Sequence, residues 1–221
     1  MKILALEFSS SQRSVAVLSF DSAGKLFAEG EAIESGGRQT RAIGMIEAAL
    51  RQAGIAREHI ERLAIGLGPG SYHGIRTAIA LAQGWQLATN VQVIGISSAD
   101  VLAEQARLQG LTGDLDIVID AQRNEFYVAR YSVACDRFAE TAPLRLAARQ
   151  EIDSSFSRGA TLLGPDLATS LPPARPLFPV AATLARLAAT RTSASNPTNL
   201  EPIYLRPVSF IKAPPTLFSP R

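Results

Sequence analysis

The sequence contains little cysteine and little histidine. Cys135 is the single cysteine, and His59 and His73 are the two histidines among 221 residues. One cysteine cannot form an intramolecular disulfide, which excludes the small disulfide-stabilised secreted scaffolds and favours a reducing compartment. Neither a second cysteine nor a Glu-x-x-His arrangement accompanies the histidines, so we expect no zinc site built by this chain alone.

Long hydrophobic runs are also absent. The first apolar run ends at Glu7 after four residues, whereas the hydrophobic region of a signal peptide needs about 7 to 15. The most apolar helical segment, residues 75–88, is interrupted by one arginine and two glutamines, and a membrane span needs roughly 18 uncharged apolar residues. We therefore expect a cytoplasmic protein with neither an export signal nor a membrane-spanning helix.

Composition and charge indicate a folded protein without a stripe of basic residues. Apolar residues make up 47% and charged residues 19%, which excludes intrinsic disorder. At about 150 residues per domain, the length gives one large domain or two lobes. Residues 1–140 carry 13 basic and 16 acidic side chains, and residues 141–221 carry 9 and 4. Because the basic residues are scattered singly, direct RNA binding by this chain is not supported.

The hydrophobic pattern of the first half predicts an α/β protein. Three strands come first, after which helices and strands alternate. The expected strands cover residues 2–8, 14–20, 25–33, 63–67 and 91–96. One expected helix ends at residue 54, and two further helices cover residues 74–88 and 97–108. The order β-β-β-α-β-α-β-α is that of one lobe of an actin-like or ribonuclease H-like fold, in which a mixed sheet is flanked by helices.

A second lobe is expected after Gly110. Apolar segments there predict strands over residues 115–120, 125–133 and 137–146 and a helix over residues 180–191. Arg123 and Asn124 stand where a tight hairpin needs positive φ values. The closing segment contains four prolines and cannot form a long helix or a central strand. We predict an N-terminal lobe over residues 1–109, a C-terminal lobe over 110–206 and a proline-rich tail over 207–221.

A glycine-rich turn is predicted between the strand over residues 63–67 and the helix over residues 74–88. Such a turn can aim backbone N–H groups and a helix N-terminus at a phosphate, or its glycines can let two backbone segments pack closely. It matches neither a Walker A loop nor the G-x-G-x-x-G fingerprint, so both interpretations stay open. The residues concerned are Gly68, Gly70, Ser71, Gly74 and Arg76.

Other candidate catalytic groups do not form a known pattern. Ser71 and His73 share the turn, but no third group or nucleophile elbow accompanies them, so a serine peptidase is not expected. Cys135 precedes an acidic residue, which disfavours a reactive thiolate, and we expect it to be structural. Glu7 and Asp120 stand at expected strand ends, where an actin-like fold could face them across a cleft. Solvated strand ends are the alternative.

Two neighbouring helices carry more small and apolar residues than one buried face requires. The helix over residues 74–88 is apolar on several faces and must be covered on more than one side. We predict a helix-on-helix interface with a partner, and packing of the two helices against each other is the alternative. The residues assigned to this interface are Ala42, Met45, Ala49, Ala78, Leu81 and Trp85.

Six segments of the sequence form a recognisable set. They are a strand with a serine-rich turn, a Gly-Pro-Gly-Ser-Tyr-His-Gly-Ile-Arg turn, Ala-Leu-Ala-Gln-Gly, Ile-Gly-Ile-Ser-Ser, Asp-Ala and Pro-Ile-Tyr-Leu-Arg, at residues 3–17, 68–76, 80–84, 94–98, 120–121 and 202–206. Together they resemble the bacterial TsaB (YeaZ) family of tRNA threonylcarbamoyladenosine biosynthesis proteins. The resemblance implies an actin-like, two-lobe fold of the ASKHA class.

The resemblance also implies a function. Members of this family are non-catalytic subunits that pair with the catalytic paralogue TsaD. With the ATPase TsaE, they support transfer of a threonylcarbamoyl group to the adenosine 3′ of the anticodon in tRNAs reading codons that begin with A. The resemblance implies that the chain has no catalytic residue, metal or cofactor of its own and that tRNA is contacted through the complex. It also implies that the two helices described above form the contact surface for the partner. A nucleotide, ATP or ADP, at the partner interface and a homodimer of the isolated chain stay open.

Three positions depart from the family pattern. Glu7 stands where the family usually has Asp, residues 38–41 read Arg-Gln-Thr-Arg where it usually has His-Ser-Glu, and Gln122 comes before the arginine that usually follows Asp-Ala. The alternative function is an independent ATP-dependent phosphotransferase on the same fold. The glycine-rich turn favours it, but a second phosphate loop would have to come from residues 164–166.

Overall fold

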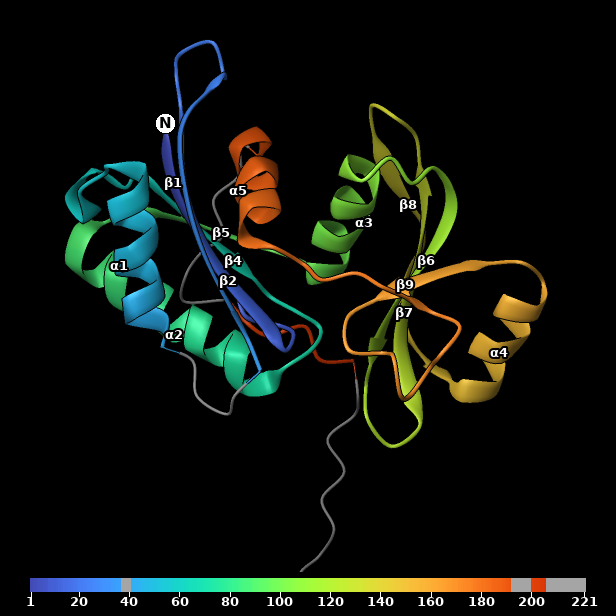
Figure 1. The fold of residues 1–221 in the computed structure, drawn as a ribbon. Helices are drawn as coiled ribbons and strands as arrows, with labels where there is room; N and C mark the ends of the chain where they lie inside the picture. Colours follow the sequence, from blue (N-terminus) through green and yellow to red (C-terminus); the bar gives the residue numbers. More distant parts are fainter. Residues whose placement is uncertain (37–40, 192–199, 206–221) are drawn as a thin grey trace, which may run out of the picture.

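The computed structural model describes residues 1–36, 41–191 and 200–205 and contains two five-stranded sheets with helices around and between them (Figure 1). Residues 38–40, which depart from the family pattern, and the predicted tail over residues 207–221 lie outside the described residues. No helix within the described ranges is long and apolar enough to cross a membrane.

The first half of the chain has the predicted order of elements. They are β1 (Lys2–Glu7), β2 (Gln12–Phe20), β3 (Leu26–Ser35), α1 (Ala42–Ala53), a 3₁₀ turn (Arg57–His59), β4 (Arg62–Gly66), α2 (Tyr72–Thr89), β5 (Gln92–Ile96) and α3 (Ser98–Leu108). The helix ends have local causes. Gly54 ends α1 with a φ of 66°, and the Oγ of Ser71 caps α2 by accepting from the N–H of Gly74 at 3.4 Å.

The second half contains the other sheet. The elements of this half of the chain are β6 (Gly113–Asp120), β7 (Glu125–Val133), β8 (Phe138–Ala148), α4 (Arg149–Ser157), β9 (Thr161–Gly164), β10 (Arg175–Pro176) and α5 (Ala181–Thr190). The predicted hairpin is confirmed, with φ values of 58° at Arg123 and 62° at Asn124. The pattern of apolar residues did not predict α4, because Ile152 and Phe156 are its only large apolar side chains.

The two sheets have the same topology. The first has the order β3-β2-β1-β4-β5, and the second has the order β8-β7-β6-β9-β10. In each, the first strand pairs antiparallel with the second and parallel with the fourth of its sheet. Two lobes built alike, each a mixed sheet flanked by helices, constitute the actin-like fold that the sequence predicts.

Helices cover both faces of the first sheet. Leu4 and Leu6 of β1 belong to the core under α1 and α2, whereas Ile3 and Ala5 belong to the core under α5. This two-sided burial explains the unbroken apolar run of β1, because successive side chains point to opposite faces. In Figure 1, α3 and α5 lie between the two sheets, and α4 lies on the far side of the second sheet.

Candidate functional site

A cavity of about 430 Å³ lies where turns from the two sheets approach each other. From the first lobe come the turn after β1, the start of α2 and Arg13 of β2. From the second lobe come the end of β6, the turn after it and the loop after β9, and Tyr204 closes the rim. The polar lining residues are Ser9, Ser10, Ser11, Arg13, Ser71, Tyr72, Asp120, Gln122, Tyr127, Asp166 and Tyr204. Hydroxyl groups dominate this lining, which therefore suits a polar ligand.

The glycine-rich turn packs tightly against the turn after β1. A Cβ atom at Gly70, whose φ is 146°, would lie 2.0 Å from the carbonyl oxygen of Ser9, and one at Gly74 would lie 1.9 Å from that of Phe8. The N–H of Ser71 donates to the same Ser9 carbonyl at 2.7 Å. These glycines are thus required by the close approach of two backbones, which supports the structural interpretation of the turn.

The predicted phosphate-turn residues do not converge on one point. Gly70 and Ser71 line the cavity, whereas Gly68, Gly74 and Arg76 do not. Gly68 bonds to Ser98, its N–H donating to the serine Oγ at 3.2 Å and its carbonyl accepting from the serine N–H at 2.8 Å. Arg76 lies over the ring of Tyr72, 5.1 Å from its centroid, and donates to its hydroxyl.

Glu7 neither faces Asp120 across the cavity nor lies at a solvated strand end, so both alternatives are wrong for this residue. Asp120 lines the cavity, but Glu7 is fully buried and accepts hydrogen bonds from the N–H of Ser9 at 3.0 Å and the Oγ of Ser98 at 3.1 Å. Burial raises the pKa of the Glu7 carboxyl above its ordinary value, and the hydrogen bonds from Ser9 and Ser98 oppose that shift. The side chain turns away because Gly66 leaves room for its carboxylate, which lies 2.1 Å from where a Cβ of residue 66 would be.

Sequence reasoning missed a contact between the two lobes at the cavity. The backbone N–H of Ser11 donates to Oδ2 of Asp166 at 2.9 Å, and the Ser11 hydroxyl donates to Oδ1. Asp166 has a φ of 59°, a conformation that Asp adopts more readily than most residues. An aspartate after Gly-Pro is a signal for such a turn, but nothing in the sequence indicates its partner 155 residues away.

Ser71 and His73 have structural surroundings, and Cys135 lies at the surface. The hydroxyl of Ser71 caps α2, and the ring of His73 makes an edge contact with Tyr72, an arrangement unlike a nucleophile with its base. Cys135 is exposed, and its carbonyl accepts from Nη1 of Arg107 at 2.8 Å. Within the described ranges, no group of three or more histidine, cysteine and acidic side chains could hold a metal ion.

Most of the predicted interface residues lie inside the chain's own core. Ala42, Met45, Ala49 and Ala78 are at most 6% exposed and belong to the cluster beneath α1 and α2, and Leu81 and Trp85 are partly buried against it. The prediction is therefore wrong for the four buried residues, because the sheet takes up the helix faces that carry them. The alternative, packing of the two helices against each other, does not describe this burial either, because α1 packs mainly on β2 and β3 and α2 on β1, β4 and β5.

The small and apolar residues that α1 and α2 leave exposed are other ones, and they lie among exposed charged and polar side chains such as Glu47, Arg51 and Gln83. Leu87 is 91% and Ile43 is 59% exposed. Small residues accompany them, since Gly44 of α1 and Ala80, Gly84 and Ala88 of α2 are exposed too. We call these six residues the outer helix surface. Helix periodicity indicated that one apolar helix face is not needed for the core. It did not indicate which face, because neighbouring rows of residues along these helices are about equally apolar in this sequence.

Comparison with known proteins places the chain in a family. Residues 37–164 match the family model described as TsaD, tRNA N6-adenosine threonylcarbamoyltransferase. An uncharacterized protein of Mycobacterium tuberculosis is 32% identical over 161 residues, covering 72% of this chain and 70% of that protein. The tRNA threonylcarbamoyladenosine biosynthesis protein TsaB of Escherichia coli is 38% identical over 92 residues, covering 41% of this chain and 39% of that protein.

A solved structure agrees with these relatives. A Pseudomonas aeruginosa protein described as uncharacterized and similar to the peptidase YeaZ superposes with a TM-score of 0.76 and is 25% identical. The match covers 93% of this chain and 99% of that one. The chain belongs to the TsaB (YeaZ) family. Membership confirms the resemblance carried by the sequence motifs and gives the chain a role in tRNA threonylcarbamoyladenosine biosynthesis.

Proposed function

We propose that this TsaB-family chain is a non-catalytic scaffold subunit. It pairs with the catalytic paralogue TsaD and, with the ATPase TsaE, supports threonylcarbamoyl transfer to the adenosine 3′ of the anticodon in tRNAs reading codons that begin with A. The observation that carries the proposal is the burial of Glu7. The carboxylate of this last residue of β1 is buried away from the cavity, so it cannot reach a substrate there.

The outer helix surface is the part of the chain that fits a partner helix. Its glycines and alanines let another helix approach closely, and Leu87 and Ile43 offer apolar area that water otherwise covers. We place TsaD on this surface, and an isolated chain would use it to form a homodimer. Contact with tRNA then occurs through the assembled complex, and any ATP or ADP is held at the interface with the partner.

Replacing Leu87 with glutamate tests the partner surface. The side chain is 91% exposed, so the variant should keep the melting temperature of the wild type. A charge placed in an apolar contact costs several kcal/mol, so co-purification with TsaD should fall at least about tenfold. Cells that depend on the variant should lose threonylcarbamoyladenosine from their tRNA.

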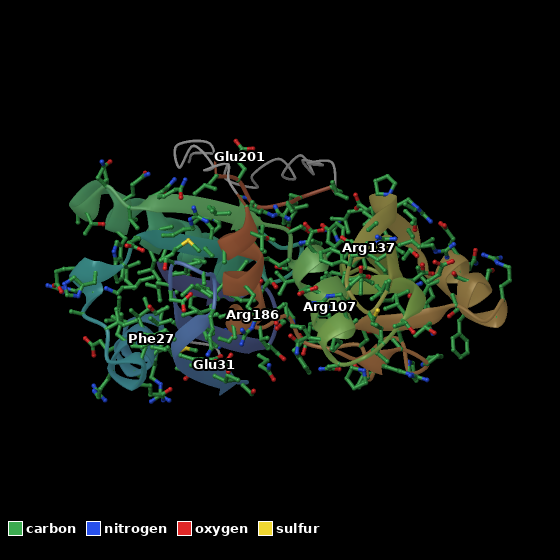
Figure 2. All side chains as sticks on the ribbon, turned by 90° about the horizontal axis from the view of Figure 1, so that it is seen from above. Phe27, Glu31, Arg107, Arg137, Arg186 and Glu201 are labelled. Atoms are coloured by element: carbon green, nitrogen blue, oxygen red, sulfur yellow. The ribbon has the colours of Figure 1, made fainter. Side chains whose placement is uncertain are left out.

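A matched control uses an equally exposed apolar residue elsewhere. Phe27 of β3, labelled in Figure 2, is 83% exposed and is not one of the six residues of the outer helix surface. Phe27→Glu should keep both TsaD binding and the tRNA modification. Full TsaD binding by a folded Leu87→Glu protein would refute the assignment of the surface.

The alternative is an independent phosphotransferase, which the hydroxyl-lined cavity favours. It requires ATP turnover by the isolated chain, with a carboxylate acting on the substrate. We expect no turnover above background. Asp120 does line the cavity. If the wild type turned over ATP and Asp120→Asn did not, the phosphotransferase would replace the scaffold proposal.

A further inference from the structure

The contact between Ser11 and Asp166 has the chemistry of anion recognition. One residue supplies two donors, its N–H to Oδ2 and its hydroxyl to Oδ1, so both oxygens of the carboxylate are held at once. A backbone N–H and a hydroxyl that converge on two oxygens of an anion would hold a phosphoryl group equally well. Here the anion belongs to the protein itself.

The carboxylate is supplied from a firmly anchored loop. Leu167, the next residue, is 1% exposed and belongs to the core of the second lobe, and its carbonyl accepts from the N–H of Leu171 at 2.7 Å. Asp166 nevertheless has a φ of 59°, a conformation that is strained for a residue other than glycine. The bonds to Ser11 offset this strain, so the aspartate is positioned by both lobes.

The cavity beside this contact has room for a polar ligand, with a volume of about 430 Å³. Its lining includes the hydroxyl-bearing Ser10 and Ser71, the cation Arg13 and the two acidic residues Asp120 and Asp166. A negatively charged ligand entering there would meet the Asp166 carboxylate at the position where the Ser11 donors converge. Like charges repel, and the donors are already used.

We propose that Asp166 is an internal anion that occupies the phosphoryl position of the Ser9–Ser11 turn and thereby keeps phosphate-bearing molecules out of the cavity. The proposal goes beyond the scaffold function, because it assigns a latent ligand class to this lobe junction. It predicts that removing the carboxylate creates a binding site rather than destroying one.

Two substitutions fit the backbone of residue 166. Asp166→Gly removes the carboxylate and suits a positive φ, and Asp166→Asn keeps the side-chain shape without the charge and also tolerates that φ. Calorimetric titration of the full chain with pyrophosphate, ADP and adenosine measures the new site. We expect pyrophosphate and ADP to bind Asp166→Gly at least about tenfold more tightly than the wild type, Asp166→Asn to show a smaller gain, and adenosine to gain nothing.

Two further variants make the result specific. Glu47→Ala removes one exposed acidic side chain of α1, away from the cavity lining, and should bind pyrophosphate no better than the wild type. Adding Ser11→Ala to Asp166→Gly removes the hydroxyl donor and should reverse most of the gain. If Asp166→Gly does not fold, the gain in pyrophosphate affinity of Asp166→Asn tests the proposal instead. Equal pyrophosphate affinity in the wild type and the folded Asp166 variants, or an equal gain in Glu47→Ala, would overturn the proposal.

Discussion

At the scale of single residues, Glu7 shows how one neighbour decides the role of a side chain. Its carboxylate occupies space that a Cβ at Gly66 would fill, and it bonds to Ser9 and Ser98. Because Gly66 has no side chain, there is room for glutamate at residue 7, which is longer than the aspartate usual in the family. The position that could face the cavity instead holds a buried group with a raised pKa.

The raised pKa of Glu7 predicts a pH effect on stability. The folded protein binds the Glu7 proton more tightly than the unfolded chain, so this stability is fully present below the ordinary pKa of 4.5 and is lost as pH rises through the folded pKa. Glu7→Gln has no such proton. Relative to that variant, the wild type should lose up to about 1.4 kcal/mol per pH unit above pH 4.5.

Urea unfolding of both proteins from pH 4.5 to 8 measures this difference. Glu47→Gln, which replaces an exposed acidic side chain of α1, is the control for the loss of one carboxylate. Parallel stability curves for the wild type and Glu7→Gln would show that Glu7 titrates alike in the folded and unfolded states.

At the scale of elements, α2 divides its residues between the core and the outer helix surface. Ala78 is 0% exposed, whereas Ala80, two residues later, is exposed. Successive helix positions are separated by about 100° of rotation, so two steps carry a side chain to the opposite face. Identical residues on one helix thus differ in what they contact.

This division predicts opposite outcomes for the same substitution. Ala78→Glu should lower the free energy of unfolding by about 3 kcal/mol or more, because it buries an unpaired charge. Ala80→Glu should change it by less than about 0.5 kcal/mol and weaken TsaD binding under the proposed function. Thermal unfolding of the two purified variants compares them directly, and similar melting temperatures would contradict the orientation of α2.

At the scale of the whole molecule, the chain returns to its first lobe at the end. The N–H of Ile203 donates to the carbonyl of Leu67 at 2.9 Å, Leu200 is 7% exposed, and Tyr204 makes an edge contact with Tyr72 at 5.6 Å between centroids. Polar contacts also link elements far apart in sequence, since the hydroxyl of Tyr131 donates to Asp100 at 2.9 Å.

The returning segment should contribute measurably to stability. A chain ending at residue 199 loses the burial of Leu200 and the bond of Ile203, and we expect a loss of about 2 to 4 kcal/mol. A chain ending at residue 205 keeps both contacts and is the matched control. Chemical unfolding of the two chains isolates the effect of residues 200–205, and equal stabilities would show that these contacts contribute nothing.

Local patterns in the sequence determined the elements of this protein. Apolar runs specified the strands, and a glycine signal specified Gly54 as the end of α1, because each depends on neighbours along the chain. The order of these elements predicted the actin-like fold, and six short motifs indicated the TsaB family. α4 was missed because its few apolar residues give little periodic signal.

Contacts between distant segments decided the site. The sequence marked a spare helix face, but the position of the first sheet determined that Ala49 is core and Leu87 is surface. It marked Glu7 as a strand-end carboxylate, but the space left by Gly66 determined its burial. Ser11 and Asp166 stand 155 residues apart, and only the packing of the two lobes brings a serine donor and a carboxylate together.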